Sequence, residues 1–159
     1  MPPQGSKAVT ESESSEFAAV VSASGAFGCV ECGKCVSVCP MVDMYPSFSY
    51  EMSPRGLLRK AQGDSDIIED ESIWYCADCN ACTETCPEGV SCRDLVRGLK
   101  EIALASGLVK NVETCSSCGA LYVPVPVLGY IHQKLEGVSA DYLDLCLWCR
   151  RQIYLRRNA

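Results

Sequence analysis

The sequence lacks several features that define large classes of proteins. No apolar run approaches the ~20 residues of a membrane-spanning helix. No basic segment followed by an apolar stretch occurs at the N-terminus, so we expect neither a signal peptide nor a membrane span. No glycine-rich phosphate loop follows a predicted strand, which argues against a flavin or nucleotide site. Histidine occurs once and no two cysteines are adjacent, but the chain contains 13 cysteines in 159 residues.

Basic residues are also few. The 14 lysines and arginines are outnumbered by 20 acidic residues, which gives a formal net charge of −6 at pH 7. Proteins that bind nucleic acid present a basic face, so we expect no nucleic-acid partner. An acidic surface fits a protein that docks on other proteins. Abundant cysteine without a predicted leader indicates a reducing compartment, and we expect the protein to be cytoplasmic.

Eight of the cysteines form one motif that occurs twice. Each copy has the spacing C-x-x-C-x-x-C-x-x-x-C-P, which is the pattern of ferredoxins with two [4Fe–4S] clusters. In that pattern the fourth cysteine of each copy ligates the cluster of the other copy. We therefore predict one cluster on Cys29, Cys32, Cys35 and Cys86, and the other on Cys76, Cys79, Cys82 and Cys39.

Two other interpretations of the eight cysteines are weaker. A disulfide framework needs an oxidising compartment. A zinc site needs only four ligands and explains neither the matched copies nor the proline after each one.

The C-terminal third contains two further C-x-x-C pairs. Four thiolates from two such pairs make a closed tetrahedral site, typical of structural zinc or of rubredoxin iron. We favour zinc, with iron as the alternative. The remaining interpretation, that the four cysteines are free or form disulfides and bind no metal, is weaker. The predicted ligands are Cys115, Cys118, Cys146 and Cys149.

The remaining pattern predicts a mainly α-helical protein in three parts. Residues 1–16 are rich in serine, glutamate and proline and are predicted to be a disordered tail. Residues 17–108 are predicted to form an α-helical domain with the two clusters, and residues 109–159 a small zinc-ribbon or rubredoxin-like module.

Local signals predict the elements within these parts. Ser53 before Pro54 predicts a helix start, and Ser91 with Asp94 a capping box. We expect a strand or helical turn at 17–21, helices at 54–62, 92–105 and 128–136, a short helix at 64–72, and strands at 121–127 and 147–155.

Single residues are assigned mostly structural roles. Cys92 is predicted to be a small buried hydrophobe, or alternatively a spare ligand or redox thiol. His132 and Trp148 are predicted at the surface, the latter as a contact for a partner. Trp74 and Tyr75 are expected to pack over a cluster. The basic residues Arg55, Arg59 and Lys60 are predicted to form either a solvated face or a docking face.

With these residues in view, the region 17–107 resembles the C-type iron–sulfur subunit of heterodisulfide reductase. It is also similar to the related iron–sulfur subunits of succinate dehydrogenase and anaerobic glycerol-3-phosphate dehydrogenase. The resemblance rests on the paired motifs, on Met52-Ser-Pro-Arg-Gly-Leu-Leu-Arg59 and on Ile73-Trp-Tyr-Cys76. It implies an α-helical ferredoxin domain that relays electrons between a flavoprotein subunit and a catalytic subunit carrying Cys-Cys-Gly motifs, which this chain lacks.

The predicted function is therefore electron transfer in a heterodisulfide reductase-like complex. No general base, nucleophile or open metal position is apparent, so we expect no turnover of substrate by the chain itself. Two alternatives belong to other classes: a freely diffusing ferredoxin, and a zinc-ribbon interaction protein whose clusters are structural or sensory.

Overall fold

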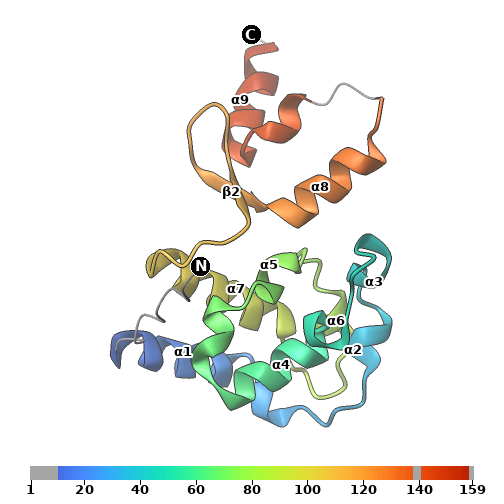
Figure 1. The fold of residues 1–159 in the computed structure, drawn as a ribbon, viewed down its shortest axis with the longest axis vertical. Coiled ribbons are helices and arrows are strands. Elements are labelled where there is room, and N and C mark those ends of the chain that lie inside the picture. The colour runs from blue at the N-terminus through green and yellow to red at the C-terminus, as the bar shows by residue number, and fades with distance from the viewer. Residues whose placement is uncertain (1–10, 138–140, 158–159) are drawn as a thin grey trace, which may run out of the picture.

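The computed structural model describes residues 11–137 and 141–157. The protein is mostly helical, as predicted (Figure 1). Its α-helices are α1 (Glu11–Ala23), α2 (Lys34–Ser37), α3 (Met41–Met44), α4 (Pro54–Gly63), α5 (Ser72–Tyr75), α6 (Ala81–Glu84), α7 (Cys92–Ala105), α8 (Val125–Lys134) and α9 (Leu147–Arg157). Its 3-10 helices are η1 (Ala26–Gly28), η2 (Tyr50–Met52), η3 (Ser65–Glu69) and η4 (Asp141–Asp144).

Helix α7 is the centre of the main core. Leu95, Val96 and Leu99 of α7 are fully buried. Helices α1, α4, α5 and α6 all contact it. Gly98 lets α1 approach closely, because a Cβ at this position would lie 2.5 Å from the Cγ1 atom of Val20. Cysteines of both motifs pack against the core that α7 organises.

The two helices with a predicted serine cap begin where their caps indicated. The Ser53 hydroxyl accepts a hydrogen bond from the Gly56 amide at 3.1 Å, and Pro54 occupies the first turn of α4. The Ser91 hydroxyl accepts from the Asp94 amide at 3.2 Å, so α7 begins at Cys92. The predicted ranges 54–62 and 92–105 therefore agree with the structure to within one residue.

Within the described residues, the C-terminal part contains a two-stranded sheet. Strands β1 (Val112–Thr114) and β2 (Leu121–Pro124) pair antiparallel, with Val112 opposite Pro124 and an irregularity between Glu113 and Thr114. Helix α8 follows β2 directly, and α9 ends the described chain beyond them (Figure 1). This part lies at one end of the molecule, away from α1 and α4, and its helix α8 contacts α5.

Two predictions about local structure were wrong. Residues 147–155, predicted as a strand, lie in α9, where Arg150 ties the helix to the preceding turn by donating to the Leu145 and Leu143 carbonyls at 2.7 and 2.8 Å. Part of the predicted disordered tail is also helical, since α1 begins at Glu11. The apolar residues Phe17, Val20 and Val21 of α1 pack on the core, and this packing stabilises the whole helix. Residues 1–10 lie outside the described residues.

Smaller differences concern element type and ends. Residues 17–21, predicted as a strand or a helical turn, belong to α1. The predicted short helix at 64–72 is the 3-10 helix η3. The predicted strand at 121–127 ends at Pro124, because Pro126 fits the first turn of α8, which therefore starts three residues before the predicted position.

Candidate iron–sulfur cavities and tail metal site

The first cysteine-lined cavity brings together three cysteines of the first motif and Cys86 from the end of the second, with Cys82 also in its wall. It has about 410 Å³ of space between its walls, including solvent at its mouth. Helices α2 and α6 contact each other, so the end of the second motif reaches the loop of the first. The cavity contains the four cysteines that the spacing predicted together, which are Cys29, Cys32, Cys35 and Cys86.

The second cavity has the reciprocal composition and about 400 Å³ of space. Cys39 reaches it from the end of the first motif and is buried at 9% exposure. Burial raises the pKa of Cys76 to about 12, so a nearby cation is needed to keep this sulfur as a thiolate. Iron of a cluster supplies such a charge. This cavity again contains all four ligands predicted for one cluster, which are Cys39, Cys76, Cys79 and Cys82.

Cys82 and Cys92 line both cavities and form the wall between them. Cys92 is 3% exposed, which confirms its predicted burial. Its Sγ lies 3.5 Å from the Pro54 carbonyl oxygen. Hydrogen bonding from the Cys92 thiol lowers the pKa of Cys82 to about 6, and the same contact raises the pKa of Cys92 itself. Cys92 thus lies beside a predicted ligand, between the two cavities.

The two motif loops repeat the same backbone geometry. Glu31 and Asp78 occupy the same place in their copies, and both have a positive φ, 55° and 53°. Gly33 and Asn80 follow the next cysteine in each copy, again with positive φ of 76° and 68°. This conformation is uncommon for residues with a side chain. Its recurrence at matching positions shows that both loops curl in the same way around their cavities.

Each loop carboxylate is paired with cations from a helix. Glu31 accepts from Arg55 at 2.7 Å and from Arg59 at 2.5 Å, both on α4. The hydrogen bond from Arg55 is the main reason that the pKa of Glu31 is lowered. On the other loop, Lys100 of α7 lies 3.5 Å from Asp78 and belongs to the same helix that supports the core.

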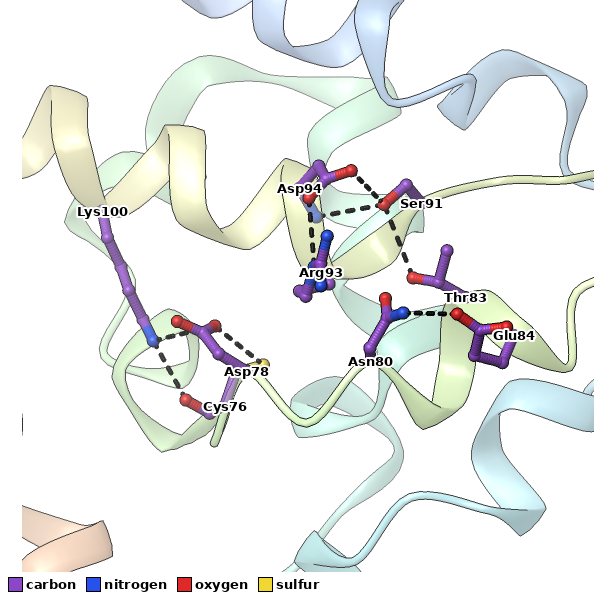
Figure 2. Close-up of polar contacts among 9 residues, drawn as sticks. All are labelled: Cys76, Asp78, Asn80, Thr83, Glu84, Ser91, Arg93, Asp94 and Lys100. Atoms are coloured by element: carbon purple, nitrogen blue, oxygen red, sulfur yellow. Dashed lines mark hydrogen bonds and ion pairs between the residues drawn. The ribbon is translucent and has the colours of Figure 1, made fainter.

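Figure 2 shows how Lys100 fixes the second loop. Its Nζ atom lies between the Asp78 carboxylate and the Cys76 carbonyl oxygen, to which it donates at 3.0 Å. The side chain of Lys100 is only 12% exposed. Because this buried ammonium pairs with the loop, α7 positions Cys76 directly.

The same figure shows polar contacts at the start of α7. The Ser91 hydroxyl donates to the Asp94 carboxylate at 2.7 Å and lies 3.4 Å from the Thr83 hydroxyl of α6. Asn80 donates to Glu84 at 2.6 Å within the second motif. These bonds connect the second motif to the helix that follows it.

The tail cysteines converge on one point. The Sγ atoms of the four predicted ligands all lie within 4.8 Å of one another. Those of Cys118 and Cys146 are 3.7 Å apart. A tetrahedral zinc site with Zn–S bonds of about 2.3 Å has sulfur atoms about 3.8 Å apart, so the group fits such an ion. The Cys146 amide donates to the Cys115 sulfur at 3.2 Å, and this bond lowers the pKa of Cys115 to about 6. All thirteen cysteines lie in the described residues and none is bridged.

Comparisons with known proteins agree with this geometry. A family model for a 4Fe-4S dicluster domain matches residues 25–90, which include all eight motif cysteines. The second C-type iron-sulfur subunit of CoB--CoM heterodisulfide reductase in Methanocaldococcus jannaschii is 32% identical over 80 residues, 50% of this chain and 40% of the relative. The C-type iron-sulfur subunit of CoB--CoM heterodisulfide reductase in Methanopyrus kandleri is 32% identical over 117 residues, 71% of this chain and 58% of the relative.

The chain is an iron–sulfur protein like the C-type subunits of heterodisulfide reductase. This confirms the resemblance drawn from the motifs and the connector. The match covers less than two thirds of each of these relatives. The four tail cysteines of this heterodisulfide reductase-like protein lie outside residues 25–90. None of the helices in the described ranges is both long and apolar enough to cross a membrane.

His132 and Trp148 lie at the surface, as predicted, whereas the packing of Trp74 and Tyr75 over a cluster stays a prediction. His132 is exposed, and Trp148 is 67% exposed. Trp74 is buried in the main core. Tyr75 packs against the group formed by Cys39, Met41 and Tyr45, next to the second cavity, with the Tyr45 ring edge-on at 5.1 Å.

Proposed function

We propose that this iron–sulfur protein transfers single electrons within a heterodisulfide reductase-like complex through two [4Fe–4S] clusters. The first cavity would hold one cluster on Cys29, Cys32, Cys35 and Cys86, and the second would hold the other on Cys76, Cys79, Cys82 and Cys39. Such clusters exchange one electron each, at potentials that the protein adjusts by burial, charge and hydrogen bonds to sulfur.

The observation that carries this proposal is the pair of adjoining cavities. Each contains the four thiolate ligands predicted for its cluster, and Cys82 and Cys92 line both cavities. Each cavity also has one exposed cysteine, Cys32 in the first and Cys79 in the second. This arrangement provides a surface approach to each cluster and a short buried path between the two. It resembles a relay and offers no open position for a substrate.

We further propose a flavoprotein subunit and a catalytic subunit with Cys-Cys-Gly motifs as partners, in the cytoplasm. The names of the relatives, which describe iron-sulfur subunits of heterodisulfide reductases, support a complex of this kind. A freely diffusing ferredoxin would instead purify alone, so anaerobic co-purification from the native host distinguishes the two possibilities.

The tail site is proposed to hold one zinc ion. Four cysteine ligands close the coordination sphere and leave no position for a substrate, which is typical of a structural site. We propose that this ion shapes residues 112–155 into a docking module, with the exposed Trp148 as one contact. Rubredoxin-type iron on the same cysteines is the alternative.

Metal and sulfide analysis of the anaerobically purified protein tests the proposal. We expect about eight iron atoms and about eight sulfides per chain from the two clusters, with one zinc from the tail. About nine irons without zinc would favour a rubredoxin-type tail. About four irons would mean that one motif set does not hold a cluster, and the relay proposal would fail.

A further inference from the structure

Arg55 is the cation that lines the first cavity. It is the second residue of α4, which Ser53 and Pro54 hold in place at its start. Its Nη2 donates to Glu31 at 2.7 Å, and its guanidinium lies 5.8 Å from the centre of the Tyr50 ring. Two independent contacts therefore fix the charge of Arg55 at the cavity wall.

One donor of this guanidinium is unused. The Nε atom of Arg55 is shielded from solvent and has no hydrogen-bond partner among the described residues. Shielding a donor of a charged group without an acceptor is costly, so native structures normally satisfy it. The remaining lining of the first cavity is mostly cysteine and apolar. The acceptor that suits this donor is the sulfur of a bound cluster.

The cations near the second cavity are already engaged. The ammonium group of Lys100 forms an ion pair with the Asp78 carboxylate and donates a hydrogen bond to the Cys76 carbonyl oxygen. Arg93, which lines the cavity, donates its Nε to Asp94 at 3.1 Å. Each of these cations is thus matched by a carboxylate of its own.

The first cavity differs from the second in a free donor, not in net charge. Arg55 and Arg59 share Glu31, and Glu88 also lines the first cavity. Two cations therefore face two carboxylates, as they do at the second cavity. What the first cavity has in addition is the Nε–H of Arg55, which is unpaired within the described residues.

We propose that Arg55 donates its Nε–H to the cluster in the first cavity and makes that cluster the higher-potential one of the two. The inference rests on the ligand sets of the proposed function. Reduction adds a negative charge to a cluster, which a nearby guanidinium stabilises. One electron would then pass from the reduced second-cavity cluster to the oxidised first-cavity cluster, with no bond made and no proton moved.

The test uses full-length, cluster-loaded protein and measures reduction potentials. Redox titrations followed by electron paramagnetic resonance give the potentials of both clusters in the wild type and in R55Q, R55K and R59Q. Cys32→Ala shows which paramagnetic signal belongs to the cluster in the first cavity, because Cys32 lines only that cavity. R59Q is the matched control: it removes the other cation of Glu31, but Arg59 is 60% exposed and does not line the cavity.

We expect R55Q to lower the reduction potential of the cluster in the first cavity and to leave that of the other cluster largely unchanged. A tenfold change in the ratio of reduced to oxidised cluster corresponds to about 59 mV for one electron, and we expect at least this shift at the first cluster. R55K keeps the charge but not the Nε–H, so its shift should be smaller, and R59Q should move the potential less than either. Equal shifts in R55Q and R59Q, a larger shift at the second cluster, or loss of the first cluster in R55Q and R55K alike would overturn the inference. A wild type with only one cluster would instead refute the proposed function.

Discussion

Replacing Gly56 by alanine should destabilise the protein, although alanine is normally the better residue in a helix. An added Cβ would lie 2.2 Å from the Tyr50 carbonyl oxygen and within 2.9 Å of two Glu51 backbone atoms. These atoms belong to η2 and cannot rotate away. The alanine gains about 1 kcal/mol of helix propensity, whereas overpacking costs about 1–3 kcal/mol. Since the contact is more than 1 Å too close, we place the cost at the upper end and expect a net loss of about 1–2 kcal/mol.

Anaerobic thermal melts of the cluster-loaded protein measure this loss. For a chain of this size, 1 kcal/mol corresponds to about 2–4 °C in Tm, so the Gly56→Ala protein should melt about 2–8 °C below the wild type. Gly129→Ala in α8 is the control, because nothing lies within 4 Å of its added Cβ; its Tm should be unchanged or slightly higher. A Gly56→Ala protein as stable as the wild type would refute the close packing of α4 on η2.

Two further predictions concern the proposed ligands. Cys39→Ala should damage the second-cavity cluster and spare the first, because Cys39 lines only the second cavity. Iron analysis and electron paramagnetic resonance measure this loss. If Cys39→Ala and Cys29→Ala lost the same signal, the fourth cysteine of the first motif would not ligate the cluster of the second motif. Cys146→Ser should release the tail metal, loosen the complex and expose the tail to protease, while the two clusters remain competent in any complex that assembles. Full assembly with lost electron transfer in that variant would instead make the tail metal a redox centre.

The grouping of the cysteines was predictable because it depends on local spacing. Two residues between cysteines curl the chain around one point, and the short helices α2 and α6 bring the two copies together. The starts of α4 and α7 were predictable for a similar reason, since a serine cap acts on amides three residues away. The ligand sets themselves stay predictions until a cluster is measured.

The errors and omissions arise from contacts distant in sequence. The helical state of residues 147–155 depends on the contacts of Arg150 with the preceding turn, which the sequence pattern did not reveal. The position of Cys92 between the cavities depends on the packing of α7 against α4 and α6. The predicted division of the chain into an α-helical domain at 17–108 and a C-terminal module at 109–159 stays a prediction as well.

The pairing of Glu31 and Asp78 with helix cations suggests why an acidic chain can hold two anionic clusters side by side. Thiolate ligands give clusters negative charge, and burial already raises the pKa of Cys35 and Cys39. Cations elsewhere on the surface would be screened beyond about 10 Å at ordinary ionic strength. Arg55 and Lys100 act at the loops themselves, where their side chains are only partly exposed. A carboxylate in each loop fixes its cation, but the Nε–H of Arg55 stays unpaired in the described part of the chain, whereas Lys100 also donates to the Cys76 carbonyl oxygen. Under the proposal above, this difference lets one repeated motif hold two clusters of different potential.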